Sequence, residues 1–306
     1  MNVRGKAYGN TDSEYREICE FLDRLSILDP HMLWESGRMS IWRHSLHAAK
    51  PVDDSFFRDN ARVWRAKTNE VVGLCISEYG RDDLFIEVHP DWHSIYPDVL
   101  DWVESAWSAD RDEVHVHLFD GDERKISHLQ ARGFVFTAHS ENKRTYDLDT
   151  ISLDYPLETG YAVQTLAEFG DLEARLALVR SAFDNPSYTI DRLNGMVASP
   201  EYHGEYDVMV IAPDGQPAAY CVGWHEAARV GYGFIEPVGT HADFRRRGFA
   251  TAVIKECFAR LKRSGIHTVE IASGAEPNPS NFLYDSLSPA TKREVHSYGK
   301  AGGKAE

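Results

Sequence analysis

Residues 245–250 read Arg-Arg-Arg-Gly-Phe-Ala, and the sequence on either side of them decides the fold. Upstream, residues 233–238 read as a strand. Downstream, the apolar residues recur with the spacing of one helix face, at Ala250, Val253, Ile254, Cys257, Phe258 and Leu261. Lys262 and Arg263 fall in the last turn, and Gly265 supplies a stop. The pattern predicts a strand, a basic loop and an amphipathic helix.

The first turn of such a helix is suited to an anionic group. A helix N-terminus leaves several backbone N–H groups without acceptors and carries about half a positive charge, which favours a diphosphate. Gly248 lets the backbone approach phosphate oxygens, because glycine has no Cβ. Ala250 keeps the first turn accessible, and the three arginines add cationic donors. We therefore expect this loop to bind a diphosphate.

Arg245, Gly248 and Ala250 also match a known signature, Gln/Arg-x-x-Gly-x-Gly/Ala at the start of a helix. In this the chain resembles the GNAT (N-acetyltransferase) superfamily. The resemblance implies that acetyl-CoA is bound as a co-substrate, with its pyrophosphate on the loop amides and its pantetheine along the preceding strand. The expected cofactor-binding residues are Val238, Gly239, Thr240, Arg245, Arg246, Arg247, Gly248, Phe249, Ala250, Thr251, Asn278 and Asn281. The two asparagines either contact the CoA arm or cap a helix.

The resemblance also suggests the catalytic residues. A tyrosine in the short helix after the next strand often donates the proton to the departing thiolate in this superfamily, and Tyr284 occupies that segment. Its alternative role is packing against the cofactor or the core. Glu236 lies on the strand that leads to the acetyl group, where an acidic residue acts as general base directly or through water. Partial burial there would raise the pKa of its carboxylate. The alternatives are a structural charge at this position, or another base among His225, Glu226, His241 and Asp243.

A weak internal repeat predicts the domain organisation. Residues 84–88 read as a strand like residues 233–238, and each is followed by a helical stripe, a strand, a short helix and a β-rich tail. The predicted tails are residues 134–148 and 292–298. We expect an α/β (α+β) protein of two tandem GNAT-like units, each a mixed, mostly antiparallel sheet flanked by helices. This arrangement is similar to that of mycothiol synthase-like proteins.

The predicted boundary lies near residue 150, which gives a degenerate GNAT-like domain at 1–150 and a catalytic domain at 151–306. In the repeat, residues 93–98 stand opposite Arg245 to Ala250. Tyr96 replaces the glycine, Pro97 removes a donor N–H, and Asp98 brings negative charge. Each of these changes opposes diphosphate binding, so the first unit is not expected to hold CoA in this way.

Composition excludes several classes of function. The net charge of −15 disfavours nonspecific binding to nucleic acid or to anionic membranes, although it would suit a cationic substrate such as an amine. No apolar run reaches the ~20 residues of a membrane span, and the N-terminus does not read as a signal segment, so a cytoplasmic location is expected. The four cysteines are scattered, and His115 and His117 have no matching ligand set, so no metal is expected.

These observations favour an acyltransferase enzyme that transfers acetyl from acetyl-CoA to a primary amine of a small molecule. The acceptor could instead be a protein N-terminus or a lysine. Alternatives of another class are a regulatory protein that senses acetyl-CoA without transfer, and an interaction scaffold with two vestigial folds. One departure from the superfamily lies after Leu287, where Ser288-Pro289-Ala290 replaces a common Gly-Phe and alters the final hairpin but not the loop.

Overall fold

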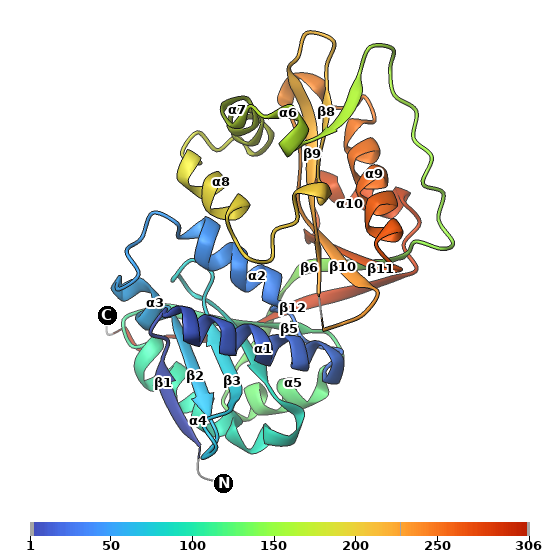
Figure 1. Ribbon diagram of the computed structural model, residues 1–306. Helices are drawn as coiled ribbons and strands as arrows, with labels where there is room; N and C mark the ends of the chain where they lie inside the picture. Colours follow the sequence, from blue (N-terminus) through green and yellow to red (C-terminus); the bar gives the residue numbers. More distant parts are fainter. Residues whose placement is uncertain (1–2, 227, 305–306) are drawn as a thin grey trace. The chain divides into compact units, whose positions relative to one another are not determined.

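The computed structural model describes residues 3–226 and 228–304, which divide into two compact units. The first unit contains residues 3–39, 50–142 and 293–304. The second contains residues 40–49 and 143–292, apart from residue 227. Each unit is a mixed sheet with helices, as the sequence predicts (Figure 1). None of the helices that the structure describes combines the length and the apolar character needed to span a membrane.

The first unit begins with a short edge strand and a long helix that Thr11 caps. In sheet order its strands are β1 (Arg4–Ala7), β2 (Ala61–Arg65), β3 (Val71–Ile76), β4 (Asp83–Val88), β5 (Glu113–Phe119) and β12 (Thr291–Ala301). All pairs are antiparallel except β4 with β5. The helices are α1 (Asp12–Leu28), α2 (Ser36–Ser40), α3 (Ser55–Asn60), η2 (Pro90–Ile95), α4 (Tyr96–Trp102), η3 (Val103–Trp107) and α5 (Glu123–Ala131).

The second unit repeats this pattern with its own single parallel pair. In sheet order its strands are the end of β6 (Val135–Asp147, of which residues 143–147 lie in this unit), β11 (Thr268–Gly274), β10 (Tyr232–Thr240), β9 (Pro217–His225), β8 (Asp207–Ile211) and β7 (Ala162–Thr165). Only β10 and β11 are parallel among the register pairs described. The helices are η1 (Ile41–Leu46), α6 (Leu166–Phe169), α7 (Leu172–Phe183), α8 (Ile190–Val197), η4 (Gly204–Tyr206), η5 (Ala242–Phe244), α9 (Phe249–Arg263) and α10 (Pro279–Ser286).

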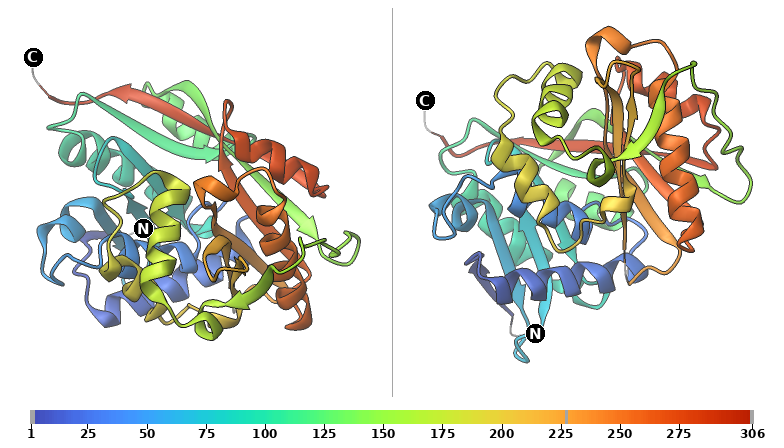
Figure 2. Two further views of the ribbon diagram at one scale, coloured as in Figure 1. Left: turned by 90° about the horizontal axis from the view of Figure 1, so that it is seen from above. Right: turned by 45° about the horizontal axis from the view of Figure 1, so that its top comes forward.

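Helices cover both faces of the sheet in the second unit. Figures 1 and 2 show α9 and α10 on one side of strands β8 to β10, and α7 and α8 on the other. The side of α9 that faces the sheet is the stripe predicted from the sequence, with Val253, Ile254, Cys257, Phe258 and Leu261 all fully buried. The opposite face of the sheet packs on Leu176, Val179 and Leu193 from α7 and α8. This two-sided packing fixes where α9 begins relative to the end of β10.

The last strand of each half does not follow the predicted domain boundary near residue 150. Residues 143–150 belong to the second unit, where Tyr146 and Leu148 are fully buried in the core that contains α9. Residues 293–304 belong to the first unit, where β12 pairs with β5 from Val295 to Ala301. The first half of the chain therefore gives the end of its last strand to the second unit, and the second half gives most of its last strand to the first unit. A sequence repeat reveals the order of the strands but not which sheet completes each one.

Residues 40–49 also cross the predicted boundary, because they pack on α8 of the second unit. Gly195 on α8 allows this contact: a Cβ at that position would lie 1.8 Å from the carbonyl oxygen of His44. The N-terminal half of the chain thus supplies two separate segments to the second unit.

Candidate functional site

Strands β10 and β11 form a very short parallel pair and then separate. Register pairs join Tyr232, Gly233 and Phe234 to residues 268–270, and none follows Phe234 in the described chain. On its other side, β10 stays paired with β9, although the register shifts between Ile235 and Val238. The edge of β10 that faces β11 is therefore open from Glu236 to Thr240. Such an edge can accept an extended ligand through backbone hydrogen bonds.

The irregular part of β10 is held by a buried tryptophan. The Nε1 of Trp224 donates a hydrogen bond of 2.6 Å to the carbonyl oxygen of Glu236. The side chain of Glu236 is exposed, so the partial burial expected for this carboxylate is not present. Further along, a Cβ at Gly239 would lie 2.6 Å from Cε1 of Tyr220, so only glycine fits there. Val238 and Thr240 on either side of this glycine are half-buried.

The loop after β10 ends at an uncapped helix. Gly248 is the N-cap of α9, has φ of 82°, and supplies no side chain to the first N–H groups. A Cβ at Gly248 would meet no atom within 4 Å, so the space beside this backbone is open. The first turn of α9 contains no acidic residue. The loop therefore has the open, donor-rich geometry that the sequence predicts for an anion site.

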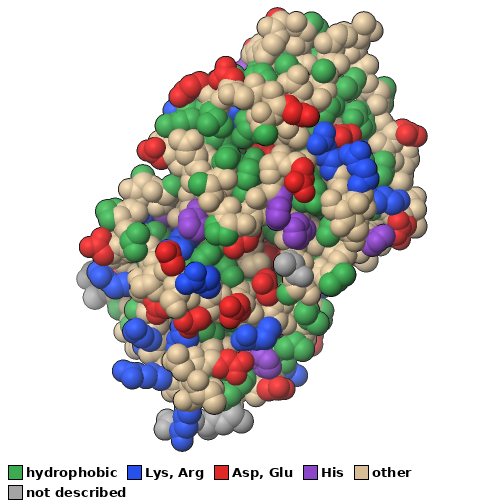
Figure 3. All heavy atoms as spheres, in the orientation of Figure 1, with side chains coloured by type: hydrophobic (Ala, Val, Ile, Leu, Met, Phe, Trp, Pro, Cys, Tyr) green, Lys and Arg blue, Asp and Glu red, His purple; other side chains and the backbone are tan. Residues whose placement is uncertain are grey.

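The residues that follow Gly248 contribute in different ways. Phe249 is only 2% exposed and belongs to the core, so its backbone N–H is the part of it that can serve a ligand. Ala250 and Thr251 are half-buried small residues that leave the first turn accessible. Figure 3 shows Lys and Arg side chains gathered at the place of α9.

The three arginines of the loop are not equivalent. Arg247 forms a bidentate ion pair with Glu158, which raises the pKa of its guanidinium, and it also lies over the ring of Tyr161. Arg245 donates to the carbonyl oxygen of Ala182 at 3.0 Å. Arg246, exposed and with φ of 65°, has no hydrogen bond or ion pair within the described part of the chain. Arg246 is thus the arginine that is available to an added anion.

Helix α10 presents Tyr284 from a buried position. The side chain is 6% exposed, and its hydroxyl has no hydrogen bond to any described residue. Burial raises the pKa of the Tyr284 phenol well above its usual value, and the nearby carboxylate of Glu236 raises it further. The phenol therefore keeps its proton at neutral pH, as a general acid must. The same electrostatic interaction indicates that Tyr284 and Glu236 lie near each other.

The two asparagines of α10 are engaged within the protein. Asn278 caps the helix, and its Oδ1 accepts from the backbone N–H of Ser280 at 3.0 Å. Asn281 is 1% exposed, and its Oδ1 accepts from Arg144 at 2.7 Å while its Nδ2 donates to the carbonyl oxygen of Gly274. The side-chain amide of Asn281, which was expected to contact the CoA arm, is therefore hydrogen-bonded within the protein. Of the two roles considered for these asparagines, helix capping is the one that Asn278 has in the structure.

The alternative bases lie at other points of the two strands. His225 pairs with Gly233 at the opposite end of β10 and stacks on His203, and burial lowers the pKa of its imidazole. His241 is the N-cap residue of η5, and its Nδ1 accepts a hydrogen bond from the backbone N–H of Asp243. Glu226 is 3% exposed, just beyond β9. With strands rising about 3.3 Å per residue, these groups are separated from the opening beside Glu236.

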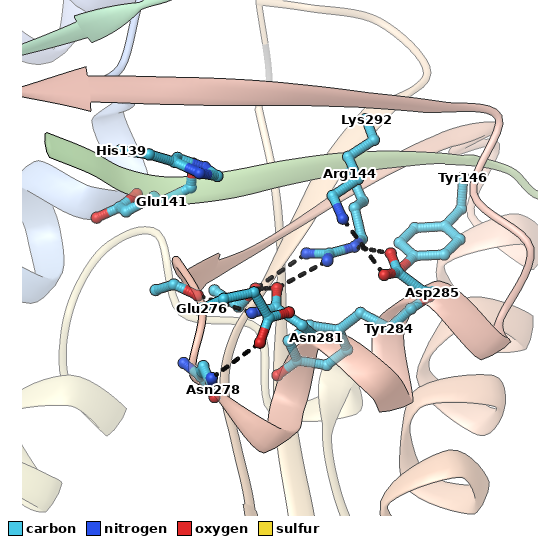
Figure 4. Close-up of polar contacts among 12 residues, drawn as sticks. His139, Glu141, Arg144, Tyr146, Glu276, Asn278, Asn281, Tyr284, Asp285 and Lys292 are labelled. Atoms are coloured by element: carbon cyan, nitrogen blue, oxygen red, sulfur yellow. Dashed lines mark hydrogen bonds and ion pairs between the residues drawn. The ribbon is translucent and has the colours of Figure 1, made fainter.

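Sequence reasoning missed two residues of this site, Arg144 and Tyr146 (Figure 4). Both project from β6 into the second unit and contact α10. Polar residues in the run Asn-Lys-Arg-Thr-Tyr are typical of a solvated strand, so the sequence carried no signal for their burial. Their part in the site is decided by which sheet receives β6.

One family of known proteins matches part of the chain. Residues 178–287 match the acetyltransferase (GNAT) family. All of these residues lie in the second unit. No curated protein matches the chain by sequence. The GNAT match supports transfer of an acyl or acetyl group as the general activity.

Solved structures extend the likeness of fold to the whole chain. A tandem GNAT protein from the clavulanic acid biosynthesis pathway is 14% identical, with a TM-score of 0.63 and full coverage of both chains. A GCN5-related N-acetyltransferase from Sphaerobacter thermophilus is 17% identical, with a TM-score of 0.60 over 96% of this chain and 95% of the other. A third, from Kribbella flavida, is 16% identical, with a TM-score of 0.51 over 75% of this chain and 87% of the other. At these identities the likeness concerns the fold, which is that of a tandem GNAT protein.

The first GNAT-like unit has the same strand separation, but side chains close it. Strands β4 and β5 are paired only from Asp83 to Phe85, and Glu87 lies two residues beyond, as Glu236 does beyond Phe234. Glu87 is 1% exposed, and Lys125 lies with its Nζ 3.9 Å from Glu87 Oε2. Lys125 stands three residues after the N-cap of α5, as Asn281 does in α10.

The helix start of this unit is also occupied. Tyr96, opposite Gly248 in the repeat, is 4% exposed and stacks on His128 at 4.6 Å between ring centroids. Helix α4 follows η2 directly, with Ile95 rather than a glycine as its N-cap. That the first unit does not bind CoA stays a prediction, and these contacts support it.

Among the residues that the structure describes, one group of potential metal ligands occurs, and it lies in the first unit. Asp82, Glu113 and His115 have ligand atoms within 4.8 Å of one another. His115 already pairs with Glu113, with 3.2 Å between Nε2 and Oε2, and its Nδ1 lies 3.2 Å from the hydroxyl of Ser297. The expectation that the protein needs no metal stays a prediction.

The buried position of Glu87 predicts a pH-dependent stability. Burial raises the pKa of its carboxyl to about 7, although Lys125 opposes this shift. A raised carboxyl pKa means that the folded state holds the proton more tightly, so its stabilising contribution is present at low pH and is lost as pH rises from 4.5 to about 7. Relative to wild type, Glu87→Gln should gain up to roughly 3 kcal/mol of unfolding free energy across that window.

Thermal and urea unfolding at a series of pH values measures this difference. Glu236→Gln is the matched control, because Glu236 has the equivalent strand position but is exposed, and it should leave the pH dependence unchanged. A stability difference between Glu87→Gln and wild type that stayed constant over the window would contradict the interpretation.

Proposed function

We propose that the second unit is an N-acetyltransferase that transfers the acetyl group of acetyl-CoA to a primary amine of a small molecule. The observation that carries the proposal is the position of the β10–β11 opening between two features. At one end lies the uncapped start of α9 behind Gly248, and beside the opening lies Tyr284, which holds its proton. An extended chain with an anionic end and a reactive thioester end fits this arrangement.

The residues around the opening suit the two ends of acetyl-CoA. The N–H groups of the first turn of α9 and the free guanidinium of Arg246 would hold the pyrophosphate. The open edge of β10 from Val238 to Thr240 would pair with the pantetheine. Bound there, the co-substrate supplies an activated acetyl thioester. Asn281 and the side chain of Phe249 support these elements from inside.

Two side chains then accept and donate the protons of the transfer reaction. Transfer forms the amide N–C bond and breaks the thioester C–S bond. An amine that arrives protonated loses one proton to become a nucleophile and a second as the amide forms, while the sulfur gains one; the second amine proton restores the Tyr284 phenol directly or through water. Exposed Glu236 accepts the first amine proton directly or through water, and Tyr284 donates its phenol proton to the sulfur. The net charge of −15 favours the approach of a cationic amine. A cytoplasmic location fits this co-substrate and is part of the proposal.

Reversing the charge at Arg246 tests the pyrophosphate site. Arg246→Glu should weaken acetyl-CoA binding about tenfold or more, since it replaces a charge-assisted bond by repulsion. Isothermal titration measures the Kd, and an upward shift of Tm on adding acetyl-CoA gives a second readout. Arg263→Glu is the matched control: the same charge change at the far end of α9, where the side chain is 69% exposed. An equal loss of acetyl-CoA affinity in the two variants would show that the loop is not part of the binding site.

Removing the phenol proton tests the transfer step. Tyr284→Phe should lower kcat by about 100-fold while acetyl-CoA affinity changes little, because only the proton donor is lost. Free CoA thiol is measured against a panel of small amines, aminoglycosides and peptides. Turnover with peptides alone would move the acceptor to protein N-termini or lysines. Acetyl-CoA binding without turnover on any amine would identify a sensor and overturn the proposed function.

A further inference from the structure

Arg144 is the most deeply buried charge beside the candidate site, and the proton transfer described above does not use it. Its side chain is fully buried at the second-unit end of β6. The guanidinium donates to three acceptors: Asp285 Oδ1 at 2.5 Å, Asn281 Oδ1 at 2.7 Å and the hydroxyl of Ser273 at 2.9 Å. Figure 4 shows these bonds converging on Arg144 from β11 and α10.

Two of the three acceptors of Arg144, Asn281 and Asp285, lie on the face of α10 that also carries Tyr284. Asn281 and Asp285 are four residues apart, so they stand one turn above the other, and Tyr284 is three residues from Asn281. Fixing both ends of this turn sets the rotation of the short helix about its axis. The direction of the Tyr284 ring depends on that rotation, because a helical side chain leaves the axis at an angle set by its Cα.

A second contact from the same strand holds the backbone of Tyr284 itself. The hydroxyl of Tyr146 donates a hydrogen bond of 2.9 Å to the carbonyl oxygen of Tyr284, and both residues are buried. Arg144 and Tyr146 lie two residues apart on β6, so their side chains leave the same face of the strand. The Nζ of Lys292 also donates a hydrogen bond of 3.3 Å to Asp285 Oδ2. Arg144 and Lys292 together lower the pKa of the Asp285 carboxyl, so it stays charged and paired.

Burying the charged Arg144 side chain costs more free energy than filling the same space with an apolar side chain. Burying a guanidinium carries a large desolvation penalty, and an apolar side chain would fill the same space without it. The planar fork of arginine, however, can hold three acceptors of two elements in one fixed geometry, which lysine and apolar residues cannot. The contact therefore has the form of a positional constraint.

We infer that Arg144, with Tyr146, is a positioning residue that aims the Tyr284 phenol at the opening between β10 and β11. This inference rests on the proposed function, because it assigns Arg144 to the proton-donating step. It also gives the first half of the chain a part in the chemistry of the second unit: the strand that ends the first half carries the two residues that orient the general acid.

A double-mutant cycle tests the inference. Arg144→Met keeps an apolar stem of similar length and should lower kcat by about tenfold or more, with the Kd of acetyl-CoA changing less than about threefold. In the Tyr284→Phe background the same substitution should lower kcat by less than about twofold, because the group it positions is absent. Arg144→Lys should recover little activity. Tyr146→Phe removes only the hydroxyl and should show the same non-additive behaviour, so it serves if Arg144→Met fails to fold.

Arg175→Met is the matched control, since Arg175 is also a fully buried arginine paired with an aspartate, Asp207. It should lower Tm, and its effect on kcat should multiply with that of Tyr284→Phe. Multiplicative losses for Arg144→Met and Tyr146→Phe as well would overturn the inference. An NMR spectrum with labelled tyrosines, in which Tyr284→Phe identifies the Tyr284 signal, reads the positioning without turnover. An unmoved Tyr284 signal in Arg144→Met would refute the inference, whereas absent turnover in wild type would refute only the proposed function.

Discussion

The site of the second unit depends on one constraint, the separation of β10 from β11 after three register pairs. A sheet of parallel strands normally continues its ladder, and each strand edge is satisfied by its neighbour. Here β10 leaves β11 after Phe234 but keeps its partner β9, with Trp224 bonded to the irregular part. The open edge leads directly into the loop that ends at Gly248. The strand edge and the helix start that we propose bind acetyl-CoA are therefore consecutive pieces of one chain segment.

The first unit shows what the same constraint becomes when the residues around it change. Its strands separate at the equivalent point, yet Glu87 turns inward and meets Lys125, whereas Glu236 stays exposed. The buried ion pair of Glu87 and Lys125 lies where the strands separate, and Tyr96 is buried at the start of the helix. The difference between an open and a closed unit thus lies in a few side chains, on a backbone plan that both units retain.

The sequence predicted those parts of the site that local chemistry decides. The strand, the loop, the buried stripe of α9 and the open backbone at Gly248 follow from spacing and from the properties of glycine, and the structure agrees with them. The burial of Asn281 and the pairing of Arg247 with Glu158 could not be predicted in the same way. Both depend on partners more than 80 residues away in sequence, and nothing in a local pattern distinguishes a free arginine from a paired one.

The exchange of last strands accounts for the burial of Asn281 and for the two missed residues, because all three depend on the position of β6. Tyr146 and Leu148, which the sequence assigned to the first domain, are fully buried in the core beneath α9, and Arg144 is buried against α10. A second domain cut at residue 151 would lack three buried side chains of its own core. The second unit therefore needs the last strand of the first half for its own core, whether or not the first half binds any ligand.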